Sequence, residues 1–174
     1  ANYSSKLGEI TNLLKKKKID FQFISASENI AWLLNIRGRD SDFSPLPNSY
    51  LGISINKKIN LFCDLRKINS SFKKKLHNIR FIDIKYTDLF ISKIKDKRIL
   101  LDSSTCSIYF QNIFKRNNKI VEYIDPIYDM KSVKSKNEIK NIIKSHIYDG
   151  AALTKFLFWL KKNYLKKNVS EISA

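Results

Sequence analysis

Residues 130–160, MKSVKSKNEIKNIIKSHIYDGAALTKFLFWL, join a helix start to a long apolar stripe near the end of the chain. Ser135 and Glu138 have the spacing of a capping box, in which the hydroxyl accepts from the third helical amide and the carboxylate accepts from the cap amide. Apolar residues then recur at helical spacing and predict one long amphipathic helix over residues 135–164. They are Ile139, Ile142, Ile143, Ile147, Leu153, Phe156, Leu157 and Leu160.

An apolar stripe of this width requires a partner surface. Residues 1–131 can supply part of it, but a following domain is the better candidate. Too few residues follow the helix to form such a domain. We therefore expect the chain to be a piece of a longer protein, in which residues 132–174 begin a further, truncated domain.

The segments before this helix alternate between strand and helix patterns. Alternation of this kind predicts a three-layer α/β domain, with a mixed sheet and helices on both faces. A capping box at Ser25 and Glu28 predicts the start of the second helix, and Gly38 its end. Strands are expected at residues 21–24, 50–55, 59–63, 79–84, 98–101 and 120–124, and helices at residues 4–17, 25–37, 70–76, 87–94 and 103–115.

The net charge of +17 raises the question of a nucleic-acid partner. Only six of the 33 basic residues are Arg, and Lys, Ile and Asn together make up roughly two-fifths of the chain. The lysines occur in short runs spread over several expected elements, which is typical of solvated surfaces. We therefore expect no specific nucleic-acid partner, although a basic nucleic-acid-binding domain stays open as an alternative.

Cys63 and Cys106 lack metal-ligand spacing and are expected to be buried thiols in a reducing compartment. No apolar run has the length of a membrane span, and the N-terminal residues ANYSSKLGEI do not have the pattern of a signal peptide. The expected location is therefore cytoplasmic, without a membrane partner.

Three segments carry a resemblance to a known family. They are ENIAWLLNIRG with DSDFSPLPNSYLGI at residues 28–38 and 40–53, DPIYDMKSVKSKNEIKNIIKSHIYDGAALTKFLFWL at residues 125–160, and VSEISA at residues 169–174. In order and spacing these segments resemble the larger Xaa-Pro aminopeptidases, which belong to the pita-bread metallopeptidases. The resemblance implies that residues 1–131 are a middle, creatinase-like domain with a ribonuclease-H-like motif, and that residues 132–174 open the pita-bread catalytic domain.

The resemblance also implies a function for the longer parent protein. Members of this family remove the N-terminal residue from peptides with proline at the second position, using two divalent metals, expected to be manganese, that share a hydroxide. The metal ligands of the family lie downstream of the segments present here. We therefore expect no catalytic residue, no metal ligand and no cofactor in this chain, and an inactive accessory role for it. The missing catalytic domain is expected to pack on the helix at residues 135–164.

Trp32 and Arg37 are the candidates for contact with substrate. A guanidinium beyond a helix end can bind a carboxylate through two hydrogen bonds, and an indole can form one wall of a proline pocket. The alternative is structural and is favoured: Trp32 packs in the core, and Arg37 pairs with Asp40 or Asp42 nearby. The loop at residues 40–48 is expected to face the catalytic domain.

Other polar residues are given structural roles. His146 and Asp149 can share a helical face, but two groups are too few for a metal site, and His77 is expected to face solvent. Asp102 is expected to cap the helix that follows it. Asp125, beside Pro126, is expected to be a surface charge at a hinge.

A non-catalytic pita-bread relative that binds other proteins is the main alternative function. The presence of two Asp, one His and two Glu at family spacing in the rest of the parent would distinguish the enzyme from it. A homodimer is also possible, because an unpartnered apolar stripe favours contact with a second copy.

Overall fold

The computed structural model describes residues 2–165 and 169–172. The chain divides into two compact units, residues 1–132 and residues 133–174. Each unit is described by itself below.

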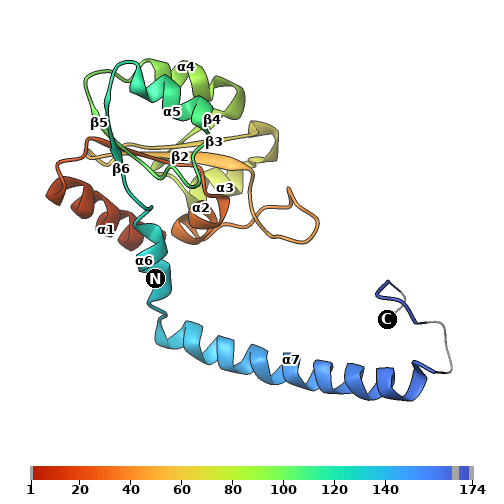
Figure 1. Cartoon of the computed structure of the whole chain (residues 1–174). Coiled ribbons are helices and arrows are strands. Elements are labelled where there is room, and N and C mark those ends of the chain that lie inside the picture. The colour runs from red at the N-terminus through yellow and green to blue at the C-terminus, as the bar shows by residue number, and fades with distance from the viewer. Residues whose placement is uncertain (1, 166–168, 173–174) are drawn as a thin grey trace. The chain divides into compact units, whose positions relative to one another are not determined.

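The first unit is built on a six-stranded mixed sheet with the order β4-β3-β2-β1-β5-β6 (Figure 1). Strands β2 and β3 form the predicted hairpin, and β1 lies antiparallel to β2 but parallel to β5. Strand β4 is parallel to β3, and β6 is parallel to β5. The strands are β1 Phe21–Ile24, β2 Ser49–Ser54, β3 Ile59–Cys63, β4 Ile79–Asp83, β5 Arg98–Leu101 and β6 Lys119–Glu122.

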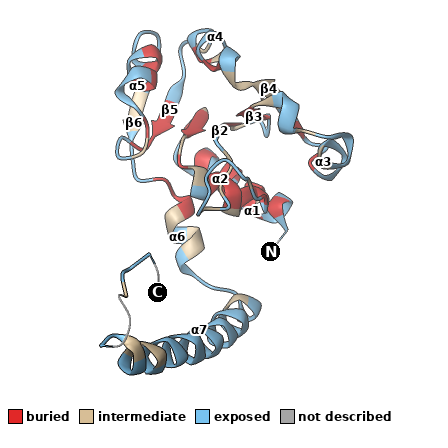
Figure 2. Ribbon diagram, turned by 90° about the vertical axis from the view of Figure 1, so that its right-hand side faces the viewer, coloured by how far each residue is buried: buried red, intermediate tan, exposed pale blue. Residues whose placement is uncertain are grey.

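Helices cover both faces of this sheet (Figures 1 and 2). One face packs against α1 (Tyr3–Lys16), α2 (Ser27–Leu34) and α3 (Ser70–Lys75). The other packs against α4 (Thr87–Ser92) and α5 (Ile108–Lys115). The predicted three-layer α/β architecture is therefore confirmed. Short 3₁₀ turns at η1 (Leu65–Lys67) and η2 (Ile84–Tyr86) connect strands to helices.

The central strand β1 explains why two layers of helices are needed. All four of its residues are buried, and alternate side chains enter opposite cores. Phe21 and Phe23 belong to the aromatic cluster under α4 and α5, whereas Ile24 belongs to the aliphatic cluster under α1 and α2. The ring of Phe23 lies 5.3 Å from that of Phe114 and 5.4 Å from that of Phe110. Aromatic pairs at these separations add to the stabilisation from burial itself.

Helix α2 differs from the sequence prediction at both ends. Its N-cap is Ala26, which makes no side-chain cap, so the predicted capping box at Ser25 does not form. The helix ends at Asn35, which adopts the left-handed conformation with φ 53°, before Gly38 is reached. Lys6 stabilises this early end, because its Nζ donates to the Trp32 carbonyl at 2.5 Å and to Asn35 Oδ1 at 2.7 Å.

Helix α5 also begins later than predicted, since residues 103–106 form a turn and Ser107 is the N-cap. A short helix that the sequence did not predict, α6 (Ile127–Ser132), ends the first unit.

The second unit consists largely of α7 (Lys136–Asn163). The predicted capping box is present in full: Ser135 Oγ accepts from Glu138 N, and Ser135 N donates to Glu138 Oε2 at 2.8 Å. No side chain of α7 is buried (Figure 2). The predicted long amphipathic helix is confirmed, and its apolar stripe is exposed.

Two glycines offer a matched test of the packing of the first unit. A Cβ at Gly52 would lie 2.5 Å from Cζ of Phe21, a ring confined by its contact with Phe114, whereas a Cβ at Gly8 in α1 would meet no atom within 4 Å. Gly52→Ala should therefore lower the free energy of unfolding by about 1–3 kcal/mol through overpacking. Gly8→Ala should raise it by about 0.5–1 kcal/mol through helix propensity. Urea unfolding followed by circular dichroism measures both, and equal effects would contradict this account.

Candidate functional site

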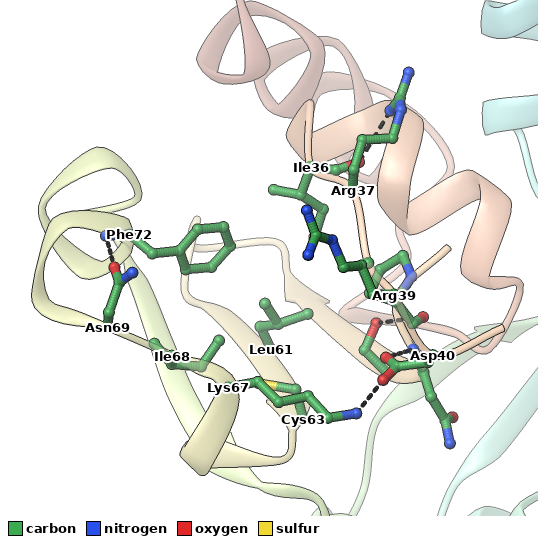
Figure 3. A pocket seen from close by; sticks show the side chains of 14 residues that line it. Ile36, Arg37, Arg39, Asp40, Leu61, Cys63, Lys67, Ile68, Asn69 and Phe72 are labelled. Carbon is green, nitrogen blue, oxygen red and sulfur yellow. Dashed lines mark hydrogen bonds and ion pairs between the residues drawn. The ribbon is translucent and has the colours of Figure 1, made fainter. Parts of the chain in front are cut away.

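A pocket lies between the loop that follows α2 and the segment from η1 to α3 (Figure 3). Its volume is about 640 Å³, which is within the usual range for small-molecule and cofactor sites. Its floor is apolar and is formed by Ile36, Leu61, Cys63, Ile68 and Phe72. Its rim is polar and includes Arg37, Arg39, Asp40, Asn48, Lys67 and Asn69.

The loop wall of this pocket is held in place by close backbone contacts. Gly38 N donates to the Pro45 carbonyl at 3.1 Å. A Cβ at residue 38 would lie 2.5 Å from the Leu46 carbonyl oxygen and from Cα of Pro47, so only glycine permits this approach. Asp40 Oδ2 accepts from Asn48 N at 2.7 Å, which closes the loop a second time. The wall is therefore positioned before any ligand arrives.

Asp40 is the acidic group on the rim, and it is already engaged. Lys67 forms an ion pair with it from η1. The hydrogen bond from Lys67, with that from Asn48 N, holds the pKa of Asp40 below its ordinary value. The carboxylate thus stays ionised and is neutralised by Lys67, which leaves the two guanidinium groups of Arg37 and Arg39 to set the charge of the rim.

The two predicted site residues are not brought together. Arg37 lines the pocket, and its Nη1 donates to the Ile36 carbonyl at 2.9 Å. Among the described residues it forms no ion pair with Asp40 or Asp42, so the expected local pairing is wrong. Trp32 is half-buried and does not line the pocket; Lys6 Nζ lies 3.9 Å from the centre of its ring.

Sequence reasoning missed Arg39 and Lys67 at this pocket. Lys67 lies far along the chain and reaches the rim because β2 and β3 pair as a hairpin and place η1 beside the loop. Arg39 is adjacent to Gly38, and a basic residue beside a glycine at a helix end was a weak local signal; the close packing of Gly38 itself is seen only in the structure. Lys67 had no comparable local signal.

A second polar cluster lies at the carboxyl ends of the parallel strands. Asp125, which follows β6, is only 2% exposed, so its prediction as a surface charge is wrong. Its Oδ1 accepts from Gln22 Nε2 at 2.9 Å and from Ile127 N at 3.1 Å, and its Oδ2 accepts from Asn29 Nδ2 at 2.7 Å. Burial raises the pKa of Asp125 although these hydrogen bonds act in the opposite direction. The carboxyl group thus joins β1, α2 and α6.

Asp102, which follows β5, supports the same cluster. Its Oδ2 accepts from Asp125 N at 2.9 Å, and its Oδ1 accepts from Ser104 N and Ser104 Oγ. Burial acts to raise the pKa of Asp102, but the hydrogen bonds from Ser104 and Asp125 lower it overall. The prediction that Asp102 caps the following helix is wrong, because α5 begins after Ser107, which is its N-cap. Asp102 instead accepts from Ser104 in the turn that precedes the helix.

Helix α6 is fastened to α2 at two further points. Tyr128 Oη donates to Glu28 Oε1 at 2.7 Å, and Lys131 Nζ donates to Asn29 Oδ1 at 2.6 Å. Glu28 is therefore used here instead of in the predicted capping box. Together with Asp125, these bonds fix the path of the chain where it leaves the first unit.

Metal-binding groups are lacking in the part of the chain that the structure describes, since no three His, Cys, Asp or Glu side chains converge there. His77 and His146 are both exposed, and His146 shares an exposed stretch of α7 with Asp149. Burial raises the pKa of both Cys63 and Cys106 to about 11, so these thiols stay protonated near neutral pH. The described residues do not fit a pair of divalent metals. None of the described helices combines the length and apolarity needed to span a bilayer.

The fold defines an α/β domain with helices on both faces of a six-stranded sheet, followed by the long helix α7. The family of the creatinase/prolidase N-terminal domain matches residues 1–138. The chain belongs to this family, as the resemblance of its sequence motifs predicted.

Curated relatives extend the match beyond residue 138. Xaa-Pro aminopeptidase 1 of Dictyostelium discoideum is 34% identical over 169 residues, which cover 95% of this chain and 26% of that protein. Xaa-Pro aminopeptidase ApepP of Drosophila melanogaster is 36% identical, over 92% of this chain and 27% of that protein. The chain thus spans about a quarter of the length of these relatives.

A solved structure gives the same result in three dimensions. The X-prolyl aminopeptidase of Caenorhabditis elegans, described as a cytosolic enzyme with a di-nuclear active site, superposes with a TM-score of 0.82 at 27% identity. The match covers 95% of this chain and 28% of that one. The similarity therefore includes much of α7 as well as the first unit.

The buried carboxyl group of Asp125 should be visible in the pH dependence of stability. Because its folded pKa is raised, the folded state binds a proton in a pH range where the unfolded chain is already ionised. Its contribution is complete below the ordinary aspartate pKa of 3.8 and is lost as the pH rises through the folded pKa. The difference in free energy of unfolding between the wild type and Asp125→Asn should therefore decrease as the pH rises from 3.8. Other titrating groups largely cancel in this difference.

Urea unfolding of both proteins at a series of pH values measures this difference. A difference that grows with rising pH would mean that the three hydrogen-bond donors outweigh burial, contrary to this expectation.

Proposed function

We propose that the parent of this chain is an Xaa-Pro aminopeptidase. Such an enzyme removes the N-terminal residue from peptides that have proline at the second position. In this proposal residues 1–131 are a creatinase-like accessory domain, and residues 132–174 are the start of the catalytic domain. The observation that supports it most is the superposition on the X-prolyl aminopeptidase of Caenorhabditis elegans, because 95% of this chain takes part and α7 is therefore included. The cytosolic description of that enzyme supports a cytoplasmic location for the parent.

Metal chemistry is assigned in this proposal to the part of the parent outside this chain. The di-nuclear site of the relative supports two metals in the parent, and manganese is the proposed identity. The residues described here do not form a metal group, so the chain alone is proposed to be inactive. Its own contribution is a rigid first unit and the helix that leads into the catalytic domain.

The apolar face of α7 is the proposed contact with that catalytic domain. Ile139, Ile142 and Ile143 are between 41% and 57% exposed, and Leu153, Phe156 and Leu157 are exposed to a similar degree. A helix with such a stripe gains stability from a packing partner more than from its intrinsic propensity. The relatives are about four times as long as the matched region, which leaves ample chain for that partner.

Arg37 and Trp32 remain proposed substrate contacts of the parent. Arg37 is among the residues that line the pocket, which supports its part in this proposal, but its guanidinium is turned away from the pocket and donates to the Ile36 carbonyl. Trp32 has less support, because Lys6 lies over one face of its ring.

Activity measurements test whether the peptidase activity belongs to the part of the parent outside this chain. The 174-residue chain with added manganese should not hydrolyse a peptide such as Arg-Pro-Pro, whereas the complete parent protein should release its first residue. The reading frame of the parent should carry two Asp, one His and two Glu downstream of residue 174. A complete parent that has these ligands but does not cleave the peptide would contradict the proposed function, and turnover by the chain alone would contradict its proposed inactivity.

The exposed stripe of α7 gives a second measurable result. In the 174-residue chain it lacks its proposed partner and should drive self-association that increases with concentration in analytical ultracentrifugation. Leu157→Glu, in the C-terminal part of the stripe, should shift the equilibrium toward monomer. Lys155→Gln changes the charge equally on the opposite face and serves as the control. A wild-type chain that stays monomeric, or equal effects of both substitutions, would contradict the role of the stripe.

A further inference from the structure

We infer that the pocket between the loop at residues 37–48 and α3 binds the carboxyl end of a short peptide whose last side chain is apolar. The carboxylate is assigned to Arg39, and the side chain to the floor. The choice of a peptide over other apolar acids rests on the proposed function. The preference for a carboxylate next to an apolar group is inferred from the pocket itself, in which the guanidinium of Arg39 lies beside an apolar floor.

Arg39 is the group that can receive the anion. Figure 3 shows its guanidinium turned toward the side chain of Ile36, over the pocket, whereas Arg37 is turned away and is held by the Ile36 carbonyl. Arg39 forms no ion pair with any acid in the described part of the chain. The nearby Asp40 is bound by Lys67 and Asn48, so it does not compete for Arg39. A planar guanidinium matches the two oxygens of a carboxylate.

The apolar floor favours a ligand that carries an apolar group beside its carboxylate. Ile36 and Leu61 are buried core residues whose side chains face the pocket, and Phe72 and Ile68 close it from the side of α3 (Figure 3). Phe72 is braced from behind by Phe81, with ring centres 5.9 Å apart. A free phosphate or acetate would satisfy Arg39 but leave the exposed parts of the half-buried Ile68 and Phe72 side chains in contact with water. An apolar side chain would bury these parts and gain free energy in proportion to the area covered.

The size and rigidity of the pocket agree with a short peptide. A volume of about 640 Å³ holds a few residues and is too small for a folded partner. The glycine contact with Pro47 and the bond from Asn48 N to Asp40 fix the loop, so binding does not have to order it. A site that is positioned in advance loses less conformational entropy on binding.

At the carboxyl end of a peptide, the carboxylate and the last side chain are attached to the same carbon atom. This matches a pocket in which a guanidinium stands at the rim of an apolar floor. An internal Asp or Glu side chain would place its carboxylate farther from the nearest apolar group.

Isothermal titration of the 174-residue chain with three acetylated dipeptides tests the inference. N-acetyl-Phe-Leu with a free carboxyl group should bind about tenfold more tightly than its C-terminal amide, the effect expected for one charge-assisted contact. N-acetyl-Phe-Gly should bind more weakly than N-acetyl-Phe-Leu, because it leaves the floor uncovered. Inorganic phosphate at the same concentration should not displace the bound peptide.

Substitutions then locate the carboxylate. Arg39→Gln should abolish the preference for the acid over the amide, and the fold should be kept because this side chain is exposed. Arg37→Gln should have a smaller effect, since its guanidinium is tied to the backbone. Arg116→Gln removes the same charge at the end of α5, on the opposite face of the sheet, and should leave the preference unchanged.

Four outcomes would overturn the inference: no binding of the acid, equal binding of acid and amide, an unchanged preference in Arg39→Gln, or displacement by phosphate. None of these measurements requires metal or turnover. A failure here is therefore distinguishable from a failure of the proposed function, which would show as a lack of peptidase activity in the complete parent while this binding persists.

Discussion

The buried carboxyl group of Asp125 is the constraint on which the first unit depends. It receives hydrogen bonds from Gln22 in the central strand, Asn29 in α2 and the backbone of Ile127 in α6, which are segments up to 103 residues apart. A buried carboxyl group is tolerated only when such partners are present. Each of these segments must therefore reach its place before the group is satisfied. The sheet, the helix layer and the exit of the chain are in this way coupled through one side chain.

A backbone contact at Gly38 similarly constrains the loop that forms one wall of the pocket. Gly38 approaches Pro47 so closely that no side chain fits between them, and this brings the two ends of the loop together before β2 begins. The same approach brings Asp40 within reach of Asn48 and Lys67. The loop geometry consequently sets the charges on the rim. Asp40 is neutralised by Lys67, and the guanidinium of Arg39 lies above the apolar floor. The arrangement of charges at this pocket therefore follows from the steric requirement for glycine at residue 38.

Local patterns predicted most elements well and long-range polar contacts poorly. The strand Phe21–Ile24 and the capping box at Ser135 were predicted correctly because their signals lie within a few neighbouring residues. The end of α2 was placed at Gly38, but Lys6 from α1 stabilises an earlier end at Asn35. The sequence pattern predicts a surface charge at Asp125, and this is wrong because its partners Gln22 and Asn29 are close only after the sheet has formed. The rim residue Lys67 was missed for the same reason. The sequence motifs, by contrast, identified the family correctly.

The two units differ in how far their apolar side chains are buried. In the first unit both sheet faces are covered by helices of the same unit, and the polar groups around Asp125 bind one another. In α7 no side chain is buried, although the helix spans 28 residues, or roughly 42 Å at the standard rise. The boundary between the units follows Ser132, the cap of α7 is Ser135, and the family match ends at residue 138. Contact density and helix capping therefore change within one short segment where the domain-family match also ends, while the similarity to the relatives continues into α7. In the proposed parent, α7 belongs to the catalytic domain that follows it, and that domain supplies the apolar contacts that α7 lacks here. Asp125, Tyr128 and Lys131 bind within the first unit and hold α6 against it.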